Sequence, residues 1–128
     1  MKISKKIGFM QGRLSSMIGN KIQAFPSKNW FKEFKIAKSM GLNLMEWTTD
    51  QNKLYKNPLL TEIGRNKIQL LSKKFNIKIE SLTGDCFMQA PFWKAKGNKR
   101  KRNGRRCRIV PIGIRAQIHH QCRTHGKC

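Results

Sequence analysis

Acidic residues are scarce in this sequence, and they are confined to its first two-thirds. The 128 residues include 28 Lys and Arg but only six Asp and Glu, which gives a formal net charge of +22. No acidic residue follows Asp85, and no histidine precedes His119. Residues 1–93 therefore lack the side chain that most often binds metals and transfers protons near neutral pH.

Long apolar runs and secretion signals are absent as well. No stretch approaches the roughly 18 apolar residues of a membrane-spanning helix. The N-terminus is basic but lacks the apolar core and small-residue cleavage site of a signal peptide. These features predict a cytoplasmic protein without a membrane partner, in which the cysteines stay reduced. The length suits a single domain with a modest core.

The charge divides the sequence near Trp93. Residues 94–128 contain twelve Lys and Arg and no acidic residue, whereas residues 1–93 carry a net charge of +10. The run KGNKRKRNGRRCR follows neither a helical nor a strand period. We therefore predict a domain over residues 1–93, followed by an irregular, disordered basic segment over residues 94–128.

The stretch over residues 30–47 organises the first part. Trp30, Phe34 and Ala37 form an apolar helical stripe, with Phe31 and Met40 beside it. The lysines of this stretch lie mostly on the opposite side, and Gly41 is placed to end the helix. The mostly apolar residues 42–45 then predict a buried strand that ends on Glu46.

Two further strands and one more helix complete the pattern. Residues 3–10 predict a strand, and residues 61–75 a helix capped by the Thr61 hydroxyl. The apolar face of that helix is predicted to hold Gly64, Ile68, Leu71 and Phe75, widened by Ile63 and Leu70. Asn76 then ends it, residues 77–82 form a third strand, and residues 83–87 a loop. Alternation at this spacing predicts an α/β fold with parallel strands.

Polar or charged residues follow each predicted strand: Gln11 and Arg13, then Glu46, then Asp85. The carboxyl ends of parallel strands meet at one edge of a sheet, where α/β proteins bind their ligands. We therefore expect these side chains to lie close together. Plainer roles remain open, namely a surface ion pair for Arg13, a surface position for Glu46 and a turn cap for Asp85.

Five segments of the first part carry a further signal: MQGRLS at 10–15, Phe25-Pro26, Asn29-Trp30, FKIAKSMGLNLMEWT at 34–48 and SLTGDCFMQAPFW at 81–93. Together they resemble the sugar phosphate isomerase/epimerase family of xylose isomerase-like TIM barrels. The resemblance covers about residues 6–93, and its most specific parts are the first and the last segment.

The resemblance implies a pocket for a sugar or sugar phosphate and proton transfer next to a sugar carbonyl, as in carbohydrate metabolism. A divalent metal commonly assists that chemistry in the family. By the same resemblance Glu46 and Asp85 are the candidate catalytic carboxylates. The candidate substrate-binding residues are Gln11, Arg13, Trp47, Phe87 and Trp93.

The barrel of that family needs about 250 residues, and the resemblance covers only its first three βα units. Most family metal ligands come from later strands. We therefore expect a partial barrel, a truncated and inactive isomerase-like protein, with no metal bound. Our hypothesis for the residues after about Ala95 is a frameshifted translation. An endonuclease IV type of nuclease is disfavoured, because its chemistry needs histidine on the early strands.

Residues 94–128 suggest two other functions. Their basic residues would bind nucleic acid non-specifically through its phosphates, which makes a small basic nucleic-acid-binding protein the alternative. Their cysteines and histidines would also suit zinc, although no C-x-x-C pair is present. These candidate ligands are Cys107, His119, His120, Cys122, His125 and Cys128.

Overall fold

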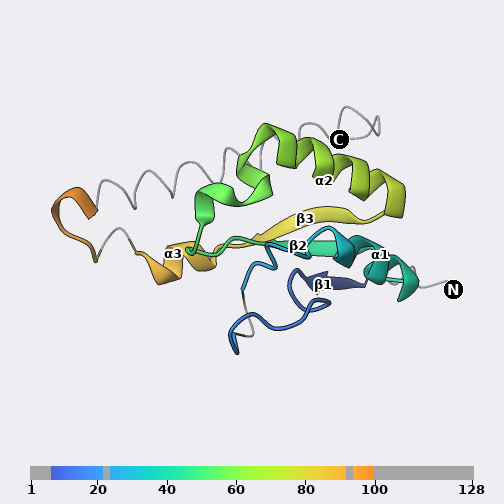
Figure 1. Ribbon diagram of the computed structural model, residues 1–128, viewed down its shortest axis with the longest axis horizontal. Helices are drawn as coiled ribbons and strands as arrows, with labels where there is room; N and C mark the ends of the chain where they lie inside the picture. The colour runs from blue at the N-terminus through green and yellow to red at the C-terminus, as the bar shows by residue number, and fades with distance from the viewer. Residues whose placement is uncertain (1–6, 22–23, 92–93, 100–128) are drawn as a thin grey trace, which may run out of the picture. The chain divides into compact units, whose positions relative to one another are not determined.

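A computed structural model describes residues 7–21, 24–91 and 94–99 of the chain (Figure 1). Its elements are β1 (Gly8–Met10), α1 (Lys32–Ser39), β2 (Leu44–Thr48), the 3-10 helices η1 (Leu54–Lys56) and η2 (Pro58–Leu60), α2 (Glu62–Phe75), β3 (Lys78–Thr83) and α3 (Asp85–Gln89). None of the helices in these residues is long and apolar enough to cross a membrane.

The three strands form one parallel sheet in the order β1-β2-β3 (Figure 1). Gly8 lies opposite Leu44 in the first pair, and Leu44 lies opposite Lys78 in the second. Helix α1 connects β1 to β2, and α2 connects β2 to β3. The predicted α/β class and the parallel sheet are therefore confirmed.

The chain divides into two units. The first comprises Met1–Thr48 and Leu70–Thr83, which include the sheet and α1. The second comprises Thr49–Gln69 and Gly84–Cys128, which include both 3-10 helices and α3.

The boundaries of the strand predicted after the first helix are wrong by two residues at each end. Strand β2 runs to Thr48, so Glu46 lies in its middle rather than at its end. The apolar run alone set the prediction, whereas Trp47 and Thr48 continue the pairing with β3. Residues 3–6 of the predicted first strand lie outside the described part, and Ile7 precedes β1.

The predicted helix ends are confirmed at three residues. Gly41 and Asn76, which follow α1 and α2, have φ angles of +74° and +54°, in the left-handed region that commonly ends a helix. The Thr61 hydroxyl accepts a hydrogen bond of 3.1 Å from the Gly64 amide at the start of α2. By contrast, α1 begins at Lys32 and not at Trp30, because a turn precedes it in which the Trp30 amide donates to the Pro26 carbonyl.

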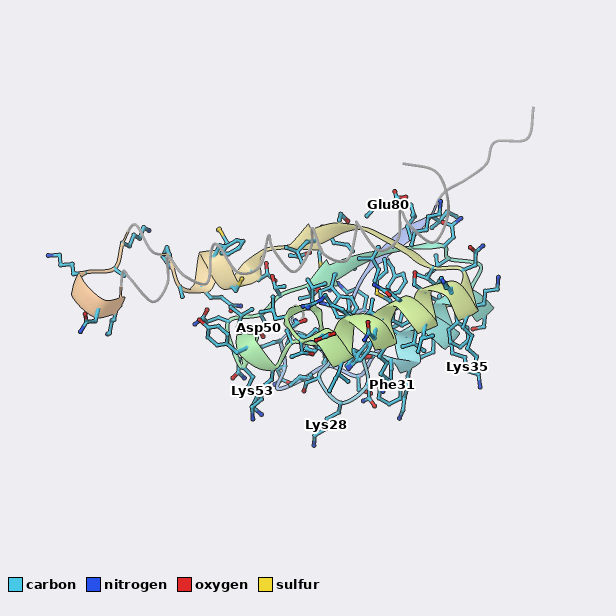
Figure 2. All side chains as sticks on the ribbon, turned by 90° about the horizontal axis from the view of Figure 1, so that it is seen from above. Lys28, Phe31, Lys35, Asp50, Lys53 and Glu80 are labelled. Atoms are coloured by element: carbon cyan, nitrogen blue, oxygen red, sulfur yellow. The ribbon has the colours of Figure 1, made fainter. Side chains whose placement is uncertain are left out.

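The core of the first unit lies on one side of the sheet. The buried side chains of Met45 and Trp47 in β2 and of Ile79 in β3 share this side with the helical stripe of Trp30, Phe34 and Ala37. Glu46 and Ser81 alternate with these strand residues and are not fully buried. Figure 2 shows Phe31 and Lys35 on one side of the sheet and Glu80 on the other.

Two expectations about packing are wrong. Ile63 and Leu70 do not widen the apolar face of α2, because their side chains are 85% and 69% exposed. Met40, expected beside the stripe of α1, is also largely exposed.

One expectation about secondary structure is wrong as well. Residues 85–87 were expected in a loop but belong to the short helix α3.

Candidate functional site

The loop over residues 11–15, with the sequence QGRLS, follows the carboxyl end of β1. It opens with a turn in which the Arg13 amide donates to the Met10 carbonyl at 3.2 Å. Gly12 has a φ angle of +96°, and a Cβ atom there would lie 2.9 Å from the Ala24 carbonyl oxygen. Both the conformation and the close approach therefore require glycine at this position.

Gln11 fixes the start of this loop to β2. Its amide donates to the Glu46 carbonyl at 2.9 Å, which extends the strand pairing by one residue. Its side-chain Oε1 accepts from the Thr48 amide at 3.1 Å, and its carbonyl accepts from the Thr48 hydroxyl at 3.0 Å. The side chain is 2% exposed, and its Nε2 has no hydrogen-bond partner among the described residues. Its predicted contact with substrate stays a prediction.

Glu33 fixes the rest of the loop. Its carboxylate accepts from the Gly12 amide at 2.9 Å and 3.1 Å, from the Leu14 amide at 3.2 Å and from the Ser15 hydroxyl at 3.0 Å. The Glu33 side chain is fully buried. A residue of α1 thus satisfies two backbone donors and one hydroxyl of a loop about 20 positions earlier in the chain.

The pKa of Glu33 reflects both effects of this environment. Burial raises its pKa above the ordinary value of 4.5, and the hydrogen bonds from Gly12, Ser15 and Leu14 partly oppose that rise. The same bonds that hold the loop therefore stabilise the ionised form of a carboxyl group that burial disfavours.

Arg13 lies between the two amides that point at Glu33, and its own side chain is exposed. Among the described residues, the structure records no ion pair for its guanidinium. The plainer role left open for Arg13, a surface ion pair, is thus not seen in that part of the chain. An exposed guanidinium is suited to bind an anion when hydrogen bonds fix its backbone, as those to Glu33 do here. Its planar fork can donate two parallel hydrogen bonds to a phosphate or carboxylate.

Glu46 lies opposite Met10 of β1 and Ser81 of β3. Its side chain is half-buried on the sheet face that does not carry the core of the first unit. Gln11 and Glu46 are thus joined through the backbone, and the expected proximity of their side chains stays a prediction. A catalytic role for Glu46 stays a prediction.

Trp47 occupies the core of the first unit. It is 0% exposed, and its ring lies 5.8 Å from the Phe25 ring and 5.6 Å from the Trp30 ring, measured between centroids. This packing supports the sheet directly next to the 11–15 loop. The predicted role of Trp47 as a pocket wall stays a prediction.

The remaining predicted site residues belong to the second unit. Asp85 is the first residue of α3 and is half-buried, as is Phe87. The Cys86 amide donates to the Thr49 carbonyl at 2.9 Å, and the Gln51 amide donates to Gln89 Oε1 at 2.8 Å. These bonds fix α3 to the segment that follows β2.

Two other predictions concern residues that the structure does not describe. Trp93 and all six candidate zinc ligands lie outside the described part of the chain. Within residues 7–21, 24–91 and 94–99, no group of three or more His, Cys, Asp or Glu is placed to hold a metal ion. The described residues therefore do not supply the ligand set for the divalent metal that the family resemblance implies.

Sequence reasoning missed the role of Glu33, although the sequence carries a signal for it. Glu33 lies three positions after Trp30 and four before Ala37, so it falls on the buried stripe of α1 rather than on the lysine side. An acidic residue on such a stripe requires buried donors as partners. The 11–15 loop provides them.

Comparisons with models of protein families, with curated proteins and with solved structures found no match to this chain.

Proposed function

We propose that the chain carries part of the pocket of a sugar-phosphate isomerase or epimerase, built on the first βα units of a xylose isomerase-like barrel. The observation that supports this proposal best is the 11–15 loop at the carboxyl end of β1. Bonds from Gln11 and Glu33 hold its backbone, while Arg13 remains exposed. Such a loop suits the binding of a sugar phosphate, with Arg13 at the phosphate and Gln11 at a substrate oxygen.

In the proposed reaction, a proton moves next to the sugar carbonyl. The family resemblance assigns Glu46 and Asp85 to that step or to the support of its base, and it assigns Trp47, Phe87 and Trp93 to the pocket walls. The described residues offer no ligand set for a divalent metal. We expect the chain to bind a sugar phosphate weakly and to lack isomerase activity by itself.

The test is a titration of the full chain with a hexose 6-phosphate, followed by NMR on the Arg13 side-chain Nε–H and on the backbone amides of the 11–15 loop. A residue-resolved signal separates this site from the basic residues after Trp93. We expect saturable shifts at Arg13, a smaller response to the unphosphorylated hexose, and loss of the shifts in Arg13→Ala. Equal shifts with both sugars, or none with either, would refute a phosphate-binding pocket.

A second assay addresses the reaction. The chain is incubated with hexose phosphates, with and without an added divalent metal, and the products are separated by chromatography. We expect no conversion by this chain. Conversion that survives Glu46→Gln would refute the role assigned to Glu46.

The second candidate function is non-specific binding of nucleic acid through residues 94–128. The observation that favours it is the presence of twelve Lys and Arg without any acidic residue in this segment. Such binding weakens steeply as salt rises, because it releases counterions from the phosphate backbone. Removal of residues 94–128 is expected to abolish the binding of a random DNA duplex; retained affinity would exclude this segment as its source.

A further inference from the structure

The carboxylate of Glu33 accepts hydrogen bonds from the backbone on both sides of Arg13, the one cation of the 11–15 loop. The Gly12 and Leu14 amides, on either side of Arg13 in the sequence, both donate to this carboxylate, and so does the Ser15 hydroxyl. Two amides that flank a residue and converge on one anion fix the backbone of that residue and direct its side chain elsewhere. The exposure of Arg13 agrees with this geometry.

The backbone of this loop has few other supports. Arg13 donates through its amide to Met10, and Gln11 is bonded to Glu46 and Thr48. Beyond Arg13, the hydrogen bonds that hold Leu14 and Ser15 within the described part of the chain are those to Glu33. Without the carboxylate, two half-buried amides and a hydroxyl lose their acceptor, and the loop loses these bonds to α1.

We propose that Glu33 is a positioning residue, whose buried carboxylate holds the 11–15 loop so that the Arg13 guanidinium is pre-arranged to bind a phosphate group. This inference rests on the proposed function, since it assigns the phosphate to Arg13. Glu33 would strengthen the binding of phosphate by Arg13, because a loop that is already in its bound conformation does not have to be ordered when the ligand binds.

Two variants and a matched control test the assignment. Glu33→Gln keeps the size of the side chain but removes the charge, and it turns the oxygen that accepts only from the Gly12 amide into an amide donor that faces it. Ser15→Ala removes a single hydrogen bond and leaves α1 unchanged. Glu80→Gln is the control, because it makes the same change of charge on an exposed residue of β3 in the same unit.

The first measurement needs no ligand. In the full chain, the Gly12 and Leu14 amide protons are expected to resonate far downfield and to exchange slowly with solvent, since they donate to a carboxylate. Both signatures are expected to be lost in Glu33→Gln and kept in Glu80→Gln. The indole N–H signals of Trp30 and Trp47 report in the same spectra whether the core remains folded.

The second measurement is a titration with inorganic phosphate at fixed pH, read at the Arg13 Nε–H. We expect Glu33→Gln to bind about tenfold more weakly, Ser15→Ala about threefold more weakly, and Glu80→Gln within twofold of the unchanged chain, the first figure being about 1.4 kcal/mol of lost pre-arrangement. If Glu33→Gln fails to fold, Ser15→Ala decides alone, and an unchanged affinity there overturns the proposal.

The two proposals fail in different ways. Absence of any phosphate response at Arg13 in the unchanged chain refutes the proposed pocket, whatever the loop amides show. A response that Arg13→Ala abolishes, but that Glu33→Gln and Ser15→Ala leave within twofold, keeps the pocket and refutes the positioning role of Glu33.

Discussion

Substitution of Trp47 separates a core role from a pocket role for the largest side chain next to the candidate site. The side chain is fully buried, and its ring contacts those of Phe25 and Trp30. Replacement of a buried tryptophan by alanine costs about 3–5 kcal/mol. Each aromatic pair adds about 0.5–1.5 kcal/mol beyond the buried area, so Trp47→Ala is expected at the upper end of that range.

A loss of this size approaches the whole stability of a small domain, which is about 5 kcal/mol at the low end. Trp47→Phe is therefore the quantitative variant, with an expected loss of about 1–2 kcal/mol. Met40→Ala, at a side chain that is 61% exposed, is the control and is expected to stay within about 0.5 kcal/mol. The assay is urea unfolding followed by circular dichroism. A Trp47→Ala chain with an unchanged unfolding midpoint but weaker hexose 6-phosphate binding would refute the core assignment.

Three further predictions follow from the loop, the cap of α2 and the buried carboxyl group. Gly12→Ala is expected to destabilise the chain by about 1–3 kcal/mol, from backbone strain and contact with Ala24; Gly19→Ala, also at positive φ but with open space around it, should cost less in the same urea assay. Thr61→Ala is expected to cost about 1 kcal/mol by loss of the cap to the Gly64 amide, and Thr61→Ser to restore it. Because burial raises the native pKa of Glu33 above 4.5, its contribution to stability is fully present below that pH and is lost as the pH rises through the raised value. The difference in unfolding free energy between the unchanged chain and Glu33→Gln should therefore fall as the pH rises above about 4.5; a difference that stays flat contradicts the raised pKa.

The α/β pattern could be predicted because each helix and strand carries its own local signal. The stripe of Trp30, Phe34 and Ala37 is buried as its spacing indicated. Gly41, Thr61 and Asn76 lie at helix ends because their conformational or hydrogen-bonding preferences act within one turn. Alternation of such elements then implies a parallel sheet without knowledge of any contact.

The predictions were wrong or incomplete where contacts between residues distant in the sequence determine the length of a strand or the burial of a side chain. Strand β2 extends to Thr48 because Thr83 and Gln11 provide its partners, and no local pattern reports them. Ile63 and Leu70 fit the apolar side of a helix by spacing alone, yet α2 buries a narrower face. The role of Glu33 was not predicted, because the helix dipole alone already accounts for an acidic residue in the first turn of a helix.

The hydrogen bonds that Glu33 accepts also explain why a carboxylate is retained in the core, although its burial costs free energy. A neutral glutamine would avoid most of the desolvation that raises the pKa of Glu33. Its amide nitrogen, however, would face donors, whereas both carboxylate oxygens accept from Gly12 and one also accepts from Leu14 and Ser15. All three donors of the loop thus converge on Oε1, and the Gly12 amide also reaches Oε2. A carboxylate accepts at both oxygens, whereas a glutamine would place a donor against the Gly12 amide. The buried carboxylate of Glu33 therefore accounts both for the energetic cost of burial and for the fixed conformation of the loop. A substitution that removes this cost also removes the hydrogen bonds that position Arg13.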